Sequence, residues 1–338
     1  MEIKEVLFKV VDGNNLTNEE TYFMMDKIMK GEIEASQAGA FLTALRIKGE
    51  TTTEIAAAAK AMRDNGTYLE GAEDAIDIVG TGGDNLASIN ISSISSFVIA
   101  AAGVKVAKHG NRSVSSKCGA ADLYEALGIN IKTDPKKAKE IYDKIGMIFL
   151  FAQVYHSAMK NAGPIRKALG YRTVFNILGP LTNPCHTKNI LLGSYSKELL
   201  PVIAEVAKLV GIKNALIVHG EDGLDEVTLT GKTYMAELRN GVISEFTFDP
   251  KAYGFEYCKL EDLVGGDPSV NKDIALKILN NENSKRRDAV ILNAGLAIYI
   301  ATDGISIQKG IDIAREIIAS GKALDKLKEY IKVSNLWY

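Results

Sequence analysis

The chain has 338 residues, of which 46% are hydrophobic, and a formal net charge of −2 at pH 7. The length allows one large domain or two smaller ones, and the near-neutral charge argues against a protein that coats nucleic acid or an anionic membrane. The three cysteines are widely spaced, the longest apolar run (145–154) is too short to cross a bilayer, and the charged N-terminus is unlike a secretory signal, so we expect a cytoplasmic protein without a disulfide framework.

Residues 1–66 show helical periodicity and no strand pattern. Thr17 with Glu20, and Thr51 with Glu54, have the spacing of capping boxes, so they predict the starts of two helices. One further helix is expected before them, from Ile3 onward, and another over 35–47. The apolar faces exceed what so small a bundle needs, which indicates a dimer surface. We expect a small helical domain over 1–70.

The next stretch has the pattern of an anion site. A short β-branched run (76–79) predicts a buried strand, and Gly80, Gly82 and Gly83 end it in a tight turn. A helix is expected over 91–102, and its N-terminus would add unsatisfied N–H donors to those of the turn. Asp84 and Asn85 follow the last glycine where a Walker loop needs Lys and then Ser or Thr, and Asn85 stands where a dinucleotide fingerprint needs Gly or Ala. A glycine turn without a ligand is the alternative. A carboxylate beside a phosphate also suggests Mg²⁺.

The rest of the chain alternates strands and helices, which favours a largely parallel α/β sheet with ligands at the carboxyl ends of its strands. A strand over 104–107 should lead into a polar loop over 108–116. The segment 180–184 is rich in turn residues and is a candidate hinge between domains. The other expected helices are 119–127, 135–145, 158–169, 199–210, 290–301 and 305–318, the last two closing the chain, and the other expected strands are 147–151, 191–194 and 215–219, with strand-like runs over 227–248.

Three further groups could carry chemistry. Lys108, His109, Asn111 and Arg112 would suit a phosphate or pyrophosphate, although an ordinary charged surface loop is the alternative. Asp225 and Glu226 repel each other unless they are solvated or bridged, and Mg²⁺ with a polyphosphate is the usual bridge. On a predicted helix, Arg166 has the planar fork that fits a carboxylate, or it makes a surface salt bridge. We treat His156, His186 and His219 as structural.

In this order, the motifs 80–84, 90–93, 108–112, 175–184 and 225–226 resemble those of the anthranilate phosphoribosyltransferase family of tryptophan biosynthesis, and the match covers nearly the whole chain. The resemblance implies a class IV phosphoribosyltransferase fold, in which a small N-terminal helical domain joins a larger α/β domain whose mostly parallel central sheet is flanked by helices. The larger domain would comprise 71–164 and 189–338, with a segment around 165–188 packing on the small one. A homodimer through the helical domain is also implied.

The implied enzyme transfers the phosphoribosyl group of phosphoribosyl pyrophosphate (PRPP) to the amine of anthranilate. By this resemblance Lys108, Asn111 and Arg166 would be catalytic, and anthranilate would contact Gly80, Asn111 and Arg166. Two Mg²⁺ ions would be held by Ser92, Asp225 and Glu226. The residues implied for PRPP are Gly80, Gly83, Asp84, Ser88, Asn90, Ile91, Ser92, Ser93, Lys108, His109, Gly110, Asn111, Arg112, Ser113, Val114, Ser115, Ser116 and Ala120.

The sequence departs from the family pattern at two places that matter. Ala120 stands where a hydroxyl is usual, and Ser157 stands where a proline commonly follows the histidine. Two alternatives remain. A pyrimidine nucleoside phosphorylase shares the general architecture but is longer, and a non-catalytic nucleic-acid-binding relative should show a basic face and a degraded glycine turn.

Overall fold

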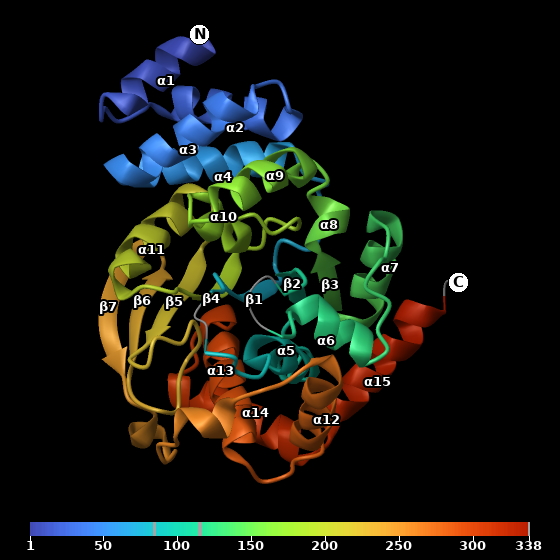
Figure 1. The fold of residues 1–338 in the computed structure, drawn as a ribbon. Coiled ribbons are helices and arrows are strands. Elements are labelled where there is room, and N and C mark those ends of the chain that lie inside the picture. Colours follow the sequence, from blue (N-terminus) through green and yellow to red (C-terminus); the bar gives the residue numbers. More distant parts are fainter. Residues whose placement is uncertain (84–85, 114–116, 337–338) are drawn as a thin grey trace.

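The computed structural model describes residues 1–83, 86–113 and 117–336. Its N-terminal helices form a bundle that lies on one side of a larger body built around a twisted sheet (Figure 1). Four helices were expected here, and four are present. They are α1 (Ile3–Val11), α2 (Asn18–Lys30), α3 (Ala35–Lys48) and α4 (Thr52–Asp64). Both predicted capping boxes are formed, at Thr17 with Glu20 and at Thr51 with Glu54.

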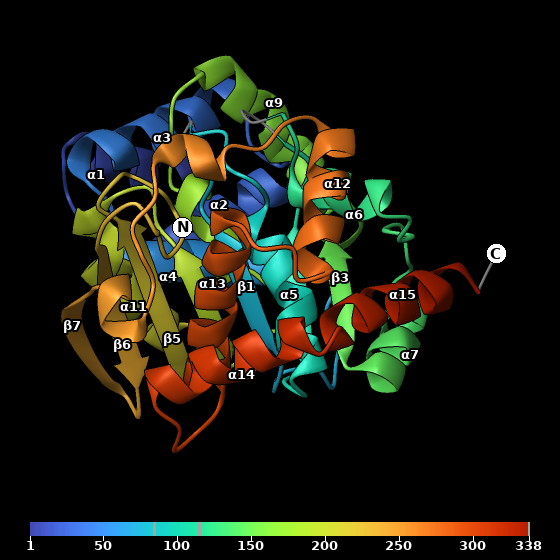
Figure 2. The same cartoon turned by 90° about the horizontal axis from the view of Figure 1, so that it is seen from below.

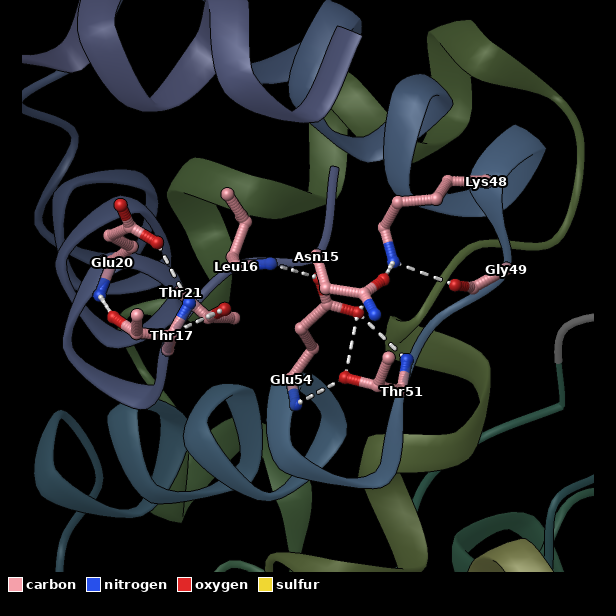
Figure 3. A network of polar contacts seen from close by, with 9 residues as sticks. All are labelled: Asn15, Leu16, Thr17, Glu20, Thr21, Lys48, Gly49, Thr51 and Glu54. Carbon is pink, nitrogen blue, oxygen red and sulfur yellow. Dashed lines mark hydrogen bonds and ion pairs between the residues drawn. The ribbon is translucent and has the colours of Figure 1, made fainter. Parts of the chain in front are cut away.

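A buried ion pair ties the bundle together (Figure 3). The carboxylate of Glu54 accepts hydrogen bonds from the backbone N–H of Leu16 (2.8 Å), from that of Thr51 (2.7 Å) and from Nζ of Lys48 (2.8 Å). Burial acts to raise the pKa of Glu54, but these donors hold it below its ordinary value. One side chain therefore joins the α1–α2 connection to the α3–α4 connection.

The sheet has seven strands in the order β3-β2-β1-β4-β5-β6-β7, and the first five of this order are parallel. The last two complete it as an antiparallel hairpin. The strands are β1 (Ile76–Gly80), β2 (Val106–Gly110), β3 (Met147–Phe151), β4 (Asn189–Gly193), β5 (Asn214–Gly220), β6 (Thr233–Arg239) and β7 (Val242–Phe248). The mostly parallel sheet is thus confirmed.

One strand boundary was predicted wrongly, with a consequence for the site. β2 begins two residues after and ends three residues after the predicted 104–107, and it pairs in parallel with β3 as far as Gly110. Lys108 and His109 are therefore strand residues, buried to 2% and 5% exposure, rather than members of a polar loop. The long polar side chain of Lys108 hides the strand pattern in the sequence, because only tertiary contacts satisfy it.

Helices cover both faces of the sheet. On one face, α5 (Ile91–Ala101) packs against β1 and β2, and the C-terminal helices lie across it (Figure 2). The opposite face is covered by α11 (Leu200–Leu209), and α4 of the bundle packs against α11. The remaining helices are α6 (Ala120–Ala126), α7 (Pro135–Ile145), α8 (Ala152–Tyr155), α9 (Met159–Leu169), α10 (Phe175–Leu181), α12 (Pro268–Leu279), α13 (Lys285–Ala301), α14 (Ile307–Ala319) and α15 (Lys322–Asn335), with 3₁₀ turns η1 (Lys197–Leu199), η2 (Pro250–Tyr253) and η3 (Leu260–Leu263).

Four of these helices were not expected, namely α8, α10, α12 and α15. The prediction that the helix at 305–318 closes the chain was wrong, because that helix is α14 and α15 follows it. The apolar residues Leu327, Tyr330 and Val333 do repeat at helical spacing, and they are buried. That spacing was a usable signal among many charged residues. Within the described residues, no helix is long and apolar enough to cross a membrane.

The two faces of the sheet have separate apolar cores. Leu191 of β4 belongs to the core beneath α5 and α13, whereas its neighbours Ile190 and Leu192 belong to the core that continues through α10 and α11 into the bundle. This alternation follows from the two-residue period of a strand. The bundle therefore shares its core with one face of the sheet, and α9 packs on α2 and α3.

Candidate active site

The candidate site lies where the strand order reverses, at the carboxyl ends of β1 and β4. Gly80 and Gly193 end these two strands and are register partners. A Cβ atom on Gly80 would lie 2.3 Å from Oδ2 of Asp225, and one on Gly193 would lie 1.5 Å from the backbone oxygen of Asp225. The two glycines thus leave room for the turn that carries Asp225 and Glu226, which we call the acidic turn. In open α/β sheets, ligands bind at such a switch point.

The glycine turn after β1 contacts the acidic turn directly. The backbone N–H of Gly82 donates to Oδ2 of Asp225 (2.6 Å), and Gly82 and Gly83 have φ angles of 71° and 79°, which glycine adopts without strain. The carbonyl of Gly83 accepts from Nη2 of Arg172 (2.5 Å), whose guanidinium stacks on Tyr195. The predicted ligand Asp84 lies outside the described residues.

The start of α5 meets the other acidic side chain. The backbone N–H of Ser92 donates to Oε1 of Glu226 (3.1 Å), so Glu226 lies at the positive end of the helix dipole. The hydroxyl of Ser92 is 3.2 Å from Nζ of Lys108, which also donates to the carbonyl of Ile78. The structure therefore brings together Ser92, Lys108, Asp225 and Glu226, which the sequence places on four separate segments.

Lys108 is a buried cation facing acids. Burial lowers the pKa of its ammonium, although the charges of Asp77, Glu226 and Asp225 act to raise it. Among the described residues, no carboxylate forms an ion pair with it. An ammonium group held in a water-poor site beside a glycine turn is well placed to interact with a ligand's negative charge.

His109 faces away from the acidic turn, toward the end of α10. Its Nδ1 donates to the carbonyl of Gly179 (3.2 Å), and its backbone N–H donates to Asp77 (3.1 Å). Nε2 is buried without a hydrogen-bond partner among the described residues, and burial lowers the pKa of the ring to about 3. His156 lies 5.1 Å away between ring centroids and donates to the carbonyl of Thr182.

The segment 180–185, at the end of α10 and just after it, is buried and hydrogen-bonded to the sheet. The positions 180–185 are all buried, and the first two belong to α10. Nδ2 of Asn183 donates both to the carboxylate of Asp77 (2.7 Å) and to the carbonyl of Ala107 (2.7 Å), and burial raises the pKa of Asp77 to about 6. The hinge expected at 180–184 stays a prediction.

The loop after β2 is braced by α6. Arg112 forms ion pairs with Asp122 and Glu125 (2.8 Å each), and these carboxylates raise its pKa. Asn111 is exposed, and its side-chain oxygen accepts from the backbone N–H of Arg112 (2.8 Å). β2 ends at Gly110, where a Cβ atom would lie 2.8 Å from the Phe149 ring. Ala120 begins α6 beside it, and Ser113 N–H donates to Asp122. The predicted ligands Val114, Ser115 and Ser116 lie outside the described residues.

The other predicted PRPP residues line the approach to α5. Ser88 pairs with Val264 in an isolated antiparallel bridge. The amide of Asn90 is used within the protein, because its Nδ2 donates to the Cys118 carbonyl and its Oδ1 accepts from Asn271. Ile91 and Ser93 are buried to 0% and 1% exposure.

Arg166 lies on α9, half-buried, with its guanidinium over the ring of Phe175 at 5.2 Å. Burial lowers the pKa of its guanidinium. Within the described part of the chain no carboxylate pairs with it, so the alternative of a structural salt bridge does not hold here. An arginine fork that no carboxylate of the described residues pairs with is suited to a ligand carboxylate.

The residues present fit Mg²⁺. Asp225 and Glu226 supply carboxylate oxygens, Ser92 a hydroxyl, and Mg²⁺ in enzymes is typically held by one or two carboxylates plus substrate phosphates and water. The described residues contain no cluster of three or more His, Cys, Asp or Glu side chains that could hold a metal ion. Sequence reasoning missed Arg172, Asn183 and Gly193, which give no local signal because their partners are distant in the chain.

Comparison with known proteins places the chain. Residues 72–324 match the a/b domain, and residues 4–66 the helical bundle domain, of a glycosyl transferase family. An anthranilate phosphoribosyltransferase from Methanobrevibacter smithii is 50% identical over 333 residues, 98% of this chain and 99% of that protein. The crystal structure of the anthranilate phosphoribosyltransferase from Thermus thermophilus has a TM-score of 0.93 and 41% identity, with 97% of this chain and 99% of that chain covered.

The Saccharomyces cerevisiae anthranilate phosphoribosyltransferase, in complex with PRPP and Mg, has a TM-score of 0.89 and 30% identity, and 98% of this chain and 97% of that chain are covered. In complex with 4-fluoroanthranilate it has a TM-score of 0.88 and 29% identity, with the same coverage. The matches span both domains, and they include the glycine turn, the α5 start and the acidic turn. The chain belongs to the anthranilate phosphoribosyltransferase family of enzymes.

Proposed function

We propose that this enzyme transfers the 5-phosphoribosyl group of PRPP to the amine of anthranilate, giving N-(5-phosphoribosyl)anthranilate and pyrophosphate, the second step from chorismate in tryptophan biosynthesis. The observation that carries the proposal is the meeting of the glycine turn, the α5 start and the acidic turn, through Gly82 with Asp225 and Ser92 with Glu226. The yeast relative that binds PRPP and Mg supports it.

The chemistry asks for stabilisation of a departing pyrophosphate. Mg²⁺, two ions in our proposal, would neutralise its charge when bound by Asp225, Glu226 and Ser92. Lys108 would hold a phosphate oxygen from the base of the site, and Arg112 would act from the loop after β2. Because an oxocarbenium-like state forms at the ribose, charge stabilisation matters more than a strong nucleophile.

The acceptor needs orientation more than activation. The amine of anthranilate is a weak base and is neutral at pH 7, so its lone pair is free without a general base. Arg166 would bind the carboxylate, and Asn111 would direct the amine, with Gly80 close by. The guanidinium of Arg166 lies over the Phe175 ring and forms no ion pair with a carboxylate of the described residues, which supports this assignment.

We also propose a cytoplasmic homodimer formed through the helical domain. Three large apolar side chains of α1 and α3 are exposed, Phe8 at 68%, Val11 at 58% and Ile47 at 80%. α1 and α3 pack on each other, and exposed apolar surface on neighbouring helices is typical of a protein interface. The boundaries of a small domain at 1–70 and a large one at 71–164 and 189–338 remain part of this proposal.

Anthranilate fluorescence tests the activity. Purified protein, PRPP and Mg²⁺ together should abolish the fluorescence of anthranilate, and omission of any one should preserve it. Fluorescence that persists while PRPP still binds would discard anthranilate as acceptor and keep the phosphate site. Phosphorolysis of thymidine would instead identify a nucleoside phosphorylase, and salt-dependent DNA binding a nucleic-acid-binding relative.

A further inference from the structure

The acidic turn is held on its N-terminal side by a carboxylate outside the proposed site. Oδ1 of Asp222 accepts from the backbone N–H of Leu224 (3.1 Å), and its Oδ2 accepts from the hydroxyls of Thr228 (2.8 Å) and Thr230 (2.6 Å). These bonds close the loop between β5 and β6 across the two acids. The backbone entering Asp225 is therefore fixed by groups that contribute nothing to its carboxylate.

On the C-terminal side of the acidic turn, the buried side-chain amide of Asn293 binds the backbone of Val227. Asn293, in the middle of α13, accepts from the backbone N–H of Val227 (3.0 Å) through Oδ1, and its Nδ2 donates to the Val227 carbonyl (2.8 Å). Nδ2 also donates to the carbonyl of Ala289 (3.0 Å). The amide of Asn293 thus pairs with both backbone groups of Val227, as a neighbouring strand would. This pairing fixes the backbone that follows Glu226.

Asn293 is an unusual choice for its position. It is 0% exposed, and the residues before and after it in α13, including Leu292 and Ala294, are buried and apolar. Burying an amide costs free energy unless each polar group is paired, and an apolar residue would pack there without that requirement. A fully paired amide is retained where it specifies a geometry. Here the geometry that it specifies is that of the acidic turn.

The turn itself needs such support. Asp225 and Glu226 are adjacent and each only 8% exposed, so their like charges repel in a site with little water. They point to different donors, Asp225 to the N–H of Gly82 and Glu226 to that of Ser92. Without fixed backbone on both sides, repulsion would turn one of them away from the site.

We propose that Asp222 and Asn293 are positioning residues that hold Asp225 and Glu226 in their Mg²⁺–pyrophosphate-binding geometry before the ligand arrives. This inference rests on the proposed function, in which the two acids bind the metal. Groups that orient metal ligands from outside typically change metal affinity or activity by 10- to 100-fold when they are removed.

The test measures metal binding apart from turnover. Binding of Mn²⁺ in the presence of inorganic pyrophosphate is followed by electron paramagnetic resonance, and the Mg²⁺ concentration for half-maximal activity is measured separately. Asn293→Leu and Asp222→Ala should each weaken Mn²⁺ binding by about 10-fold or more and raise the Mg²⁺ requirement similarly. Asp222→Asn should have a smaller effect, because the hydroxyls of Thr228 and Thr230 can rotate to accept from the new amide.

Ser95→Ala is the matched control for Asn293→Leu. Ser95, on α5, is equally buried, and its hydroxyl donates to the carbonyl of Val290 on α13, the helix that carries Asn293 (3.2 Å). No hydrogen bond joins the Ser95 hydroxyl to the acidic turn in the described part of the chain. The control should keep the wild-type Mn²⁺ affinity even where its thermal midpoint falls. If Asn293→Leu does not fold, Asp222→Ala, which is nearer the surface, decides the question.

Unchanged Mn²⁺ affinity in both Asn293→Leu and Asp222→Ala would overturn the inference. Asp225→Asn and Glu226→Gln test the metal site itself, separately from the positioning role of Asp222 and Asn293. If these two weaken Mn²⁺ binding and the positioning variants do not, only the positioning role fails. If Asp225→Asn and Glu226→Gln also leave Mn²⁺ binding unchanged, the metal site of the proposed function fails, and the inference fails with it.

Discussion

The backbone oxygen of Asp225 lies so close over Gly193 that a Cβ atom on Gly193 would be only 1.5 Å from it. We therefore expect Gly193→Ala to push the acidic turn out of the site. A displacement of about 1 Å can lower a rate by roughly 100-fold, and a loss of that order in kcat/KM is expected. Gly163→Ala on α9 is the control, since a Cβ there meets nothing within 4 Å. Equal activities of the two variants would contradict the close approach.

Lys108→Met should separate catalysis from stability. Loss of one charged group that stabilises the leaving group typically lowers kcat by about 100- to 1,000-fold. The urea midpoint should stay the same or rise, because the variant no longer buries an ammonium group. Steady-state kinetics and urea unfolding of the same preparation check both outcomes. A variant that keeps kcat but unfolds easily would make Lys108 a structural residue.

Arg166→Ala should affect one substrate selectively. A hydrogen bond to a charged group contributes roughly 1.5–3 kcal/mol, so the KM for anthranilate should rise about 10- to 100-fold, with a much smaller change for PRPP. Arg166→Lys should recover only part of the loss, because lysine lacks the planar fork. Lys167→Ala, an exposed neighbour on α9, serves as control. Equal increases in both KM values would exclude the carboxylate role.

The buried histidines should make stability depend on pH. Burial lowers the pKa of His156 to about 4 and that of His109 to about 3, so below about pH 6.5 the unfolded chain binds protons that the folded protein does not. Their contribution is fully present above pH 6.5 and is lost as pH falls toward the folded values. Asp77, whose pKa burial raises to about 6, acts oppositely and adds stability as pH falls below 6.

His156→Gln should therefore reduce the loss of unfolding free energy between pH 6 and 5 by about 1 kcal/mol per pH unit. Urea unfolding at half-unit pH steps measures this slope. Thr182→Val is the control, because it removes a buried hydroxyl that bonds to Gly179 without changing any titrating group. It should lower stability at every pH and keep the wild-type slope. An unaltered slope in His156→Gln would show that the ring is not buried in solution.

The ion pair of the bundle should be far more sensitive than those at the surface. Glu54→Ala removes an acceptor from the buried Lys48 ammonium and from two backbone N–H groups, and breaking a buried ion pair typically costs about 3–5 kcal/mol. Glu32→Ala, which breaks the exposed pair with Lys27, should cost less than about 1 kcal/mol. Thermal and urea midpoints compare the two. Similar small losses would mean that water reaches Glu54.

Local signals determined much of this protein. The capping boxes at Thr17 and Thr51, the apolar helix after Asn90, and the helix from Pro135 to Ile145 were all predicted from short windows, and the structure has them. They were predictable because capping and periodicity involve residues at most one or two turns apart. The ordered motifs also sufficed to indicate the family, which the comparisons confirm.

Only the tertiary structure decided how the site is assembled. The contact of Gly82 with Asp225 joins residues 143 positions apart, and that of Asn293 with Val227 joins residues 66 apart. No window of sequence contains both partners, and the strand order that brings β1 beside β4 is not encoded by either strand alone. For the same reason Lys108 was placed in a loop. A polar side chain within a buried strand is satisfied by Ser92 and Ile78, which only the folded sheet puts in reach.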